Sequence, residues 1–206
     1  MKNQAKRIFV TGIGTNIGKT LIAAILVEAK KADYWKPIQA GNLNDSDTLK
    51  VQALVSNDQS IFHKESYLLS QPLSPHAAAA IDSVHIELDK INMPETKKTL
   101  IIEGAGGIMV PLNEKDLVVD LIKYLNADVV LVSQNYLGSI NHTLLSVEAL
   151  KSRNIPILGI VFNGASVSAS EEFILTYTGL KCLGRVPFMK EINKKRVKEV
   201  GGLLLV

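Results

Sequence analysis

The sequence predicts an α/β fold in which helices cover a mostly parallel sheet. Short apolar runs alternate along the chain with segments of helical periodicity, a pattern typical of parallel strands joined by crossover helices. Several of these runs are apolar throughout, as expected of strands buried on both faces. No Pro/Gly/Ser-rich linker and no internal repeat divides the 206 residues, so we expect one domain over 1–206.

The individual elements follow from the same alternation. The predicted strands are residues 7–11, 34–37, 99–103, 129–133, 157–163 and 182–186. The predicted helices are residues 19–30, 45–55, 116–126, 139–152 and 171–177. The stretch 56–94 is the least regular part of the chain, and we expect it to fold over the edge of the sheet rather than form a domain.

The segment that joins the first strand to the first helix is rich in glycine. Residues 10–20 read Val-Thr-Gly-Ile-Gly-Thr-Asn-Ile-Gly-Lys-Thr, and such a turn before a helix N-terminus points backbone N–H groups at an anion. We expect Gly14 and Gly18 to take backbone angles closed to other residues, Lys19 to reach the outer phosphates, and Thr20 to offer a hydroxyl to Mg2+. The strict phosphate-loop pattern has glycine where Ile13 stands, and a plain glycine-rich turn with an exposed lysine is the alternative. The context predicts a P-loop NTPase-like three-layer fold.

Composition excludes several classes of function. A hydrophobic fraction of 47% with 21% charged residues is ordinary for a globular protein, and no apolar run reaches the roughly 18 residues that span a bilayer. The net charge of +3 does not indicate nucleic acid, and the basic cluster at 194–196 is interpreted as a solvated helix face. The single Cys182 forms no internal disulfide, and no signal-peptide pattern precedes the first strand, so we expect a cytoplasmic protein with no membrane partner. No Cys or His spacing suggests zinc.

Ligands of open parallel sheets bind beyond the carboxyl ends of the strands, and several strand ends here are chemically unusual. Glu103 ends an apolar strand, where a carboxylate could face Mg2+, and Asp47 is the candidate second carboxylate. Asp47 could equally be an ordinary helix N-cap. Lys36 could stabilise negative charge on a reacting phosphoryl group or an anionic substrate, or be a solvated lysine at the sheet edge. The segments 163–164 and 187–188 follow two further strands, and we expect all four ends to face the phosphate loop.

Taken together, these motifs resemble the dethiobiotin synthetases, ATP-dependent enzymes of biotin synthesis. The resemblance covers nearly the whole chain in family order. It rests on the phosphate loop and on Lys36-Pro37-Ile38-Gln39-Ala40-Gly41, Ser46-Asp47, Ser74-Pro75-His76, Glu103-Gly104-Ala105-Gly106-Gly107, Leu137-Gly138-Ser139-Ile140-Asn141-His142, Asn163 and Gly184-Arg185-Val186-Pro187.

The resemblance implies a reaction and a set of residue roles. An amine of 7,8-diaminononanoate takes up CO2 (from bicarbonate) as a carbamate, ATP phosphorylates it, and the second amine closes the ring with release of ADP and phosphate. Lys36, Lys19 and Thr15 are then catalytic, Thr20, Asp47 and Glu103 bind Mg2+, and Ala40 and Asn141 contact substrate, Asn141 from the partner subunit of a homodimer. ATP-binding residues are Asn16, Ile17, Gly18, Lys19, Thr20, Leu21, Asp47, Glu103, Gly104, Ala105, Gly106, Asn163, Gly164, Pro187, Phe188 and Met189.

The chain departs from the family pattern at a few positions. Ala40 stands where a Ser or Thr hydroxyl is usual, Asn16 replaces a frequently acidic residue, and Lys194 lies roughly where some members place an acidic ribose contact. The rival interpretation is a nucleotide switch of the partitioning or site-placement ATPase type. Those proteins carry a second lysine in the phosphate loop, and here that position is Gly14.

Overall fold

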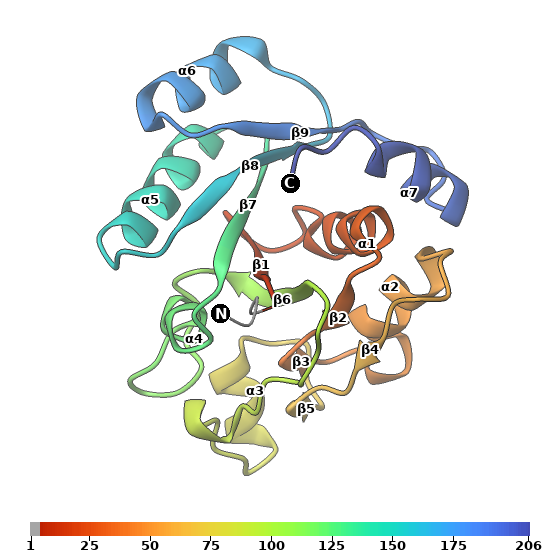
Figure 1. Ribbon diagram of the computed structural model, residues 1–206. Coiled ribbons are helices and arrows are strands. Elements are labelled where there is room, and N and C mark those ends of the chain that lie inside the picture. Colours follow the sequence, from red (N-terminus) through yellow and green to blue (C-terminus); the bar gives the residue numbers. More distant parts are fainter. Residues whose placement is uncertain (1–4) are drawn as a thin grey trace.

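The computed structural model describes residues 5–206. They form three layers, with a parallel sheet between two layers of helices (Figure 1). The sheet has seven strands in the order β4-β2-β6-β1-β7-β8-β9, and every neighbouring pair runs parallel. The strands are β1 (Arg7–Gly12), β2 (Asp33–Trp35), β4 (Phe62–His63), β6 (Leu100–Gly107), β7 (Asp128–Gln134), β8 (Ile157–Asn163) and β9 (Cys182–Val186). The predicted fold class and all six predicted strands are therefore confirmed.

Helices cover both faces of this sheet. Helices α1 (Lys19–Lys30), α2 (Asp47–Leu54) and α7 (Lys194–Gly201) share a buried apolar cluster on one face. Helices α3 (Pro75–Ile81), α4 (Val118–Tyr124), α5 (Ser139–Lys151) and α6 (Ser168–Thr178) pack on the other. The central strands are buried on both sides, which explains why their sequences are apolar without alternation. None of the helices in the described part is long and apolar enough to cross a membrane.

The stretch 56–94 has more structure than its sequence indicates. It supplies the edge strand β4, and β5 (Tyr67–Leu69) pairs with β3 (Ile38–Ala40) in a separate two-stranded parallel sheet. Helix α3 begins at Pro75, which suits the first helical position because its missing N–H would have no partner there. Two short 3-10 turns, Leu43–Asp45 and Leu88–Lys90, complete the connections. The expectation that this stretch folds at the sheet edge is right, but its short elements escaped the sequence patterns.

Several boundaries differ from prediction for local reasons. Strand β2 ends at Trp35 rather than residue 37, because Pro37 has no N–H to donate to a neighbouring strand. Helix α2 begins at Asp47 rather than 45, and Ser46 is its N-cap, whose hydroxyl accepts from the Leu49 N–H at 3.3 Å. The basic cluster at 194–196 lies exposed on α7, as predicted.

A candidate nucleotide and substrate site

The loop between β1 and α1 wraps the N-terminus of a helix. Gly18 has φ of 96°, and a Cβ there would lie 2.2 Å from Nδ2 of Asn163, so the expectation for Gly18 is confirmed. Gly14 has no positive φ and open space around it, so the expectation for Gly14 is wrong, and Asn16 (φ 58°) takes the second left-handed position instead. Lys19 Nζ donates to the Gly14 carbonyl at 2.8 Å, which curls the side chain over the loop. The Lys19 ammonium and the N-terminus of α1 therefore lie together at this loop, an arrangement that suits an anion.

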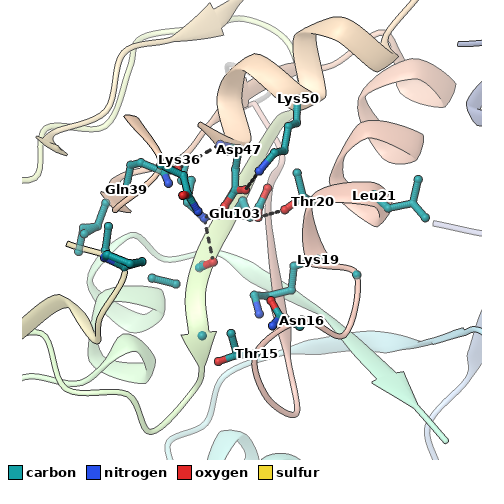
Figure 2. Close-up of a pocket in the computed structure, with 18 of the residues that line it drawn as sticks. Thr15, Asn16, Lys19, Thr20, Leu21, Lys36, Gln39, Asp47, Lys50 and Glu103 are labelled. Carbon is teal, nitrogen blue, oxygen red and sulfur yellow. Dashed lines mark hydrogen bonds and ion pairs between the residues drawn. The ribbon is translucent and has the colours of Figure 1, made fainter. Parts of the chain in front are cut away.

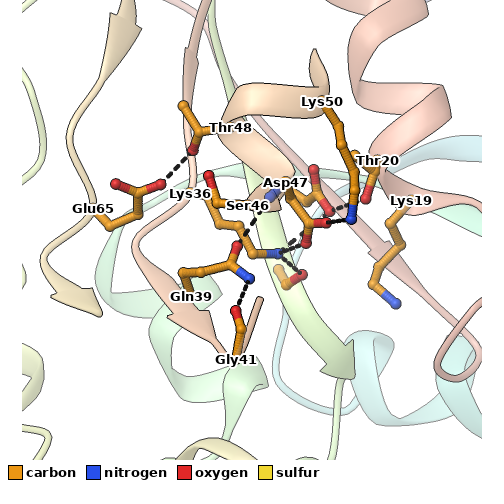
Figure 3. A network of polar contacts seen from close by, with 12 residues as sticks. Lys19, Thr20, Lys36, Gln39, Gly41, Ser46, Asp47, Thr48, Lys50 and Glu65 are labelled. Atoms are coloured by element: carbon orange, nitrogen blue, oxygen red, sulfur yellow. Dashed lines mark hydrogen bonds and ion pairs between the residues drawn. The ribbon is translucent and has the colours of Figure 1, made fainter. Parts of the chain in front are cut away.

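Lys36 lies just beyond β2 and is 4% exposed, which rules out the solvated-lysine alternative. Its Nζ lies 2.8 Å from Oδ2 of Asp47 and 3.3 Å from Oε1 of Glu103 (Figures 2 and 3). It also donates to the Gly104 carbonyl at 3.4 Å. One buried cation thus links two carboxylates that come from different elements.

Asp47 is free to face the cavity because Ser46 caps helix α2 in its place. Its backbone N–H donates to Oε1 of Gln39 at 3.2 Å, and Gln39 Nε2 donates to the Gly41 carbonyl at 2.8 Å (Figure 3). Gln39 therefore braces the connection between β3 and α2. This bracing places the Asp47 carboxylate against Lys36, so the N-cap alternative for Asp47 is wrong.

Glu103, on β6, is 1% exposed and accepts hydrogen bonds at both oxygens. Oε1 accepts from the Thr20 hydroxyl at 2.8 Å, and Oε2 accepts from the Tyr34 hydroxyl at 2.8 Å. Strands β6 and β1 are neighbours, with Val10 opposite Glu103, so the carboxylate stands beside the phosphate loop. The predicted trio Thr20, Asp47 and Glu103 is brought together around Lys36.

The charges of the site depend on one another. Burial lowers the pKa of Lys19 to about 8, since the attraction of Glu103 and Asp47 offsets the loss of hydration only in part and Lys36 adds repulsion. Burial also opposes the charge on Lys36, but Glu103 and Asp47 outweigh it and raise the pKa of Lys36. Burial likewise disfavours ionised Asp47, yet Lys36 prevails and lowers its pKa. The site thus holds an ionised Lys36 against an ionised Asp47.

These groups line one cavity of about 1180 Å³, large enough for a nucleotide and a small substrate together (Figure 2). The predicted residues that line it are Thr15, Asn16, Gly18, Lys19, Thr20, Leu21, Lys36, Ala40, Asp47, Glu103, Gly104, Ala105 and Gly106. Beyond Lys36 the wall becomes apolar, with Ile38, Pro72, Leu73, Pro75 and Val110. The cavity therefore joins a charged end at the phosphate loop to an apolar end beside β3 and α3.

Other predicted residues do not line this cavity. Ile17 is buried in the core, and Asn163 donates from Nδ2 to its carbonyl at 2.9 Å, which ties the end of β8 to the phosphate loop. Asn141 is exposed on α5. Gly164, Pro187, Phe188 and Met189 also lie outside the lining, whereas Ile192, which was not predicted, belongs to it. We expected four strand ends at the phosphate loop. The residues after β9, at 187–188, neither line the cavity nor form a hydrogen bond to the loop.

Three polar residues of the site were missed by sequence reasoning. Gln39 lies within the motif at 36–41, which assigns it no role by itself, although it braces Asp47. Lys50 lies one turn after Asp47 and points into the site, 3.9 Å from Asp47 Oδ1, which an i, i+3 spacing of opposite charges could have revealed (Figure 2). Tyr34 gave no signal, because a tyrosine in an apolar strand looks like core.

The oxygen donors fit a magnesium ion. Mg2+ is usually bound by one or two carboxylates, with phosphate oxygens and waters completing its shell. Here Thr20, Asp47 and Glu103 offer a hydroxyl and two carboxylates that line the same cavity, and Lys36 lies between the carboxylates. Among residues 5–206 no group of three or more His, Cys, Asp or Glu side chains gathers around a common point. This donor set fits a metal whose remaining ligands come from a nucleotide and water.

Comparison with solved structures identifies the fold. A ParA family ATPase from Chlorobium tepidum superposes with a TM-score of 0.59, covering 96% of this chain and 99% of that one at 13% identity. The cell division ATPase MinD of Pyrococcus furiosus gives a TM-score of 0.63, covering 97% and 98% at 14% identity. At these identities the similarity shows a shared P-loop NTPase fold and nothing about partners.

Sequence comparison is far more specific. A family model described as an AAA domain matches residues 6–196. The ATP-dependent dethiobiotin synthetase BioD of Christiangramia forsetii is 52% identical over 197 residues, which cover 94% of this chain and 95% of that protein. The enzyme of the same name from Cytophaga hutchinsonii is 51% identical and covers 93% of each chain, and that of Chlamydia pneumoniae is 47% identical, covering 92% and 84%. The chain therefore belongs to the ATP-dependent dethiobiotin synthetase family.

Proposed function

We propose that this cavity joins 7,8-diaminononanoate and CO2 in an ATP-dependent ring closure that yields dethiobiotin, ADP and phosphate. One amine adds to CO2 and loses a proton to give a carbamate, whose oxygen attacks the γ-phosphorus of ATP and displaces ADP. The second amine then attacks the carbonyl carbon of the mixed anhydride, loses a proton and expels phosphate. The observation that carries this proposal is Lys36, a buried cation between the phosphate loop and the apolar end of the cavity.

Lys36 would hold the carbamate against the nucleotide. A carbamate and a transferring phosphoryl group are both anionic, and a preorganised cation in a dry site stabilises the charge that develops between them. Glu103 and Asp47 keep Lys36 ionised, so in this proposal it acts as an electrostatic group and not as a base. Lys19 would meet the phosphates from the loop side, and Thr15, which lines the same cavity, would donate to the same oxygens.

The nucleotide would lie along the phosphate loop. Backbone N–H groups at Gly18 and the start of α1 would cradle the phosphates, with Asn16, Leu21 and the 104–106 segment around them. The base would extend toward the end of β8, where Asn163 is already fixed by its bond to the loop, and toward Gly164 and residues 187–189. These residues do not line the cavity, so we propose that the base lies beyond its edge.

Thr20, Asp47 and Glu103 would hold Mg2+ in the same proposal. When bound, the ion supplies positive charge to the phosphate oxygens during phosphoryl transfer. The chain's own contribution is to hold both carboxylates in one place. Lys36 pairs with both of them, and the Thr20 hydroxyl donates to Glu103.

The substrate chain would follow the apolar end of the cavity. Ile38, Leu73 and Val110 offer a surface for the methylenes of the diamine, and Ala40 adds a small side chain without a hydroxyl. Asn141 is exposed and does not line the cavity of its own chain. We therefore propose that Asn141 of the partner subunit of a homodimer contacts the far end of the substrate. Leu137, four residues before Asn141 in the sequence, is fully exposed, and we assign it to the same proposed interface. A cytoplasmic location belongs to the same proposal.

Phosphate release separates the proposed synthesis from the nucleotide switch, the rival interpretation of the sequence. Purified protein is supplied with Mg-ATP and bicarbonate, with and without 7,8-diaminononanoate, and phosphate and products are followed by colorimetry and mass spectrometry. We expect phosphate release that depends on the diamine and matches dethiobiotin formed. Release that ignores the diamine, or that requires a protein partner, would favour the switch.

A further inference from the structure

The hydroxyl of Tyr34 is committed to the buried carboxylate of Glu103. The two oxygens lie 2.8 Å apart, Tyr34 is 0% exposed and Glu103 is 1% exposed. Because Tyr34 is fully buried, its hydroxyl cannot exchange this hydrogen bond for one to bulk solvent. A buried tyrosine is normally placed so that its hydroxyl finds a partner, and here the partner is a residue of the candidate metal site.

The register of two neighbouring strands creates the contact. Strands β2 and β6 are parallel, with Tyr34 opposite Ile101, and both side chains pack in the apolar cluster that contains α1. Lys36 comes two residues after Tyr34, and Glu103 comes two residues after Ile101. Because side chains of a strand return to the same face every second residue, Glu103 is approached by Tyr34 from within the core and by Lys36 from the cavity.

The two carboxylate oxygens of Glu103 therefore contact different groups. Oε1 accepts from the Thr20 hydroxyl and lies 3.3 Å from Lys36 Nζ, both of which line the cavity. Oε2 accepts from Tyr34, which does not line it. The carboxylate cannot rotate about its terminal bond without breaking the Tyr34 contact, so a single oxygen is presented to the phosphate loop.

We propose that Tyr34 is a positioning residue that fixes the Glu103 carboxylate so that Oε1 is the oxygen that would be offered to a metal ion in the cavity. This inference rests on the proposed Mg2+ site at Thr20, Asp47 and Glu103. Groups that orient metal ligands from outside typically change metal affinity by about 10- to 100-fold when they are removed. Tyr34→Phe removes one oxygen atom, leaves the ring in the core, and frees the carboxylate to rotate.

The test measures metal binding directly. Mn2+ replaces Mg2+ as the probe, and its binding to the full chain in the presence of ADP is followed by electron paramagnetic resonance. We expect Tyr34→Phe to weaken Mn2+ binding about 10-fold or more. In turnover, the concentration of Mg2+ needed for half-maximal rate should rise by the same factor, while the rate at saturating Mg2+ changes far less.

Tyr67→Phe is the matched control. The Tyr67 hydroxyl also makes one hydrogen bond, accepting from the Glu87 N–H at 3.1 Å, but it lies outside the cavity lining. We expect parental Mn2+ affinity in this variant. If Tyr34→Phe also binds Mn2+ as the parent does, the positioning role is wrong. If the parent itself binds no Mn2+ with ADP, the proposed metal site fails instead.

A second variant covers the case in which Tyr34→Phe does not fold. Glu103→Gln in the same chain replaces the buried carboxylate, which has lost its hydroxyl donor, by an amide. Recovery of a cooperative thermal transition in the double variant would show that the two residues act on each other. No recovery would show that Tyr34 serves only the packing of the core, and would overturn the proposal.

Discussion

Replacing Lys36 by methionine removes the cation of the site while keeping an unbranched side chain of similar length. At an effective dielectric constant of about 20, the attractions over 2.8 Å to Asp47 and 3.3 Å to Glu103 are about 6 and 5 kcal/mol before desolvation is counted. Breaking a buried ion pair from one side typically lowers stability by about 3–5 kcal/mol. Because the Asp47 side chain keeps 25% of its exposure, we expect the low end, about 3 kcal/mol.

The assay is thermal unfolding with and without Mg2+. For a chain of this size, about 3 kcal/mol corresponds to a fall in Tm of roughly 6–12 °C. The loss should be partly reversed by millimolar Mg2+, since the ion can neutralise the two carboxylates that the lysine leaves behind. Lys50→Met is the control: Lys50 is 40% exposed and 3.3 Å from Asp45, so it should change stability by less than about 1 kcal/mol. A Lys36→Met protein as stable as the parent, whether or not Mg2+ is present, would refute the electrostatic reasoning.

Three further outcomes follow from other contacts. Glu28→Gln should lower the free energy of unfolding at pH 7 by about 1–3 kcal/mol in urea titrations, because the carboxylate accepts from Ser56 and Asn57 at 2.6–3.3 Å. Burial opposes ionisation of Glu28, but these hydrogen bonds prevail and lower its pKa below the ordinary 4.5. The difference in free energy of unfolding between parent and variant should therefore be largest above pH 4.5 and vanish as the pH falls through the lower folded-state pKa. A difference that does not depend on pH would contradict this. Gly18→Ala should weaken ATP binding at least 10-fold in calorimetry, since the added Cβ meets Asn163 in a left-handed backbone, and parental affinity would contradict the loop geometry. Leu137→Asp should convert a dimer into monomers in sedimentation experiments; a parent that is already monomeric would contradict the proposed interface.

The sequence was most informative where an apolar run ends in a residue of unusual chemistry. Glu103 and the Gly-Lys-Thr turn could be placed because parallel strands deliver their carboxyl ends to one edge. The elements β3, β4 and β5 span only two or three residues, too few for a period to show. Helix α3 was hidden because its alanine run has no apolar stripe that stands out from its surroundings.

The partners within the site depend on register, which no motif records. Whether Lys36 met water or two carboxylates was decided by the pairing of β2 with β6, and whether Asp47 capped α2 was decided by Ser46 taking that role. Gly14 shows the opposite failure: its place in a glycine-rich motif predicted a special backbone angle, which the neighbouring Asn16 adopts instead. The role of the Tyr34 hydroxyl is likewise visible only from the neighbouring strand β6, which carries its acceptor Glu103.

The central claim is that Lys36 and the phosphate loop join CO2 to the diamine at the expense of ATP. The most direct measurement supplies 13C-labelled bicarbonate, 7,8-diaminononanoate and Mg-ATP, and follows labelled dethiobiotin by mass spectrometry for the parent and for Lys36→Met. We expect the parent to incorporate the label into the product with one phosphate released for each molecule formed, and Lys36→Met to be slower by about 100-fold or more. Product without label, phosphate without product, or a Lys36→Met protein as active as the parent would contradict the account.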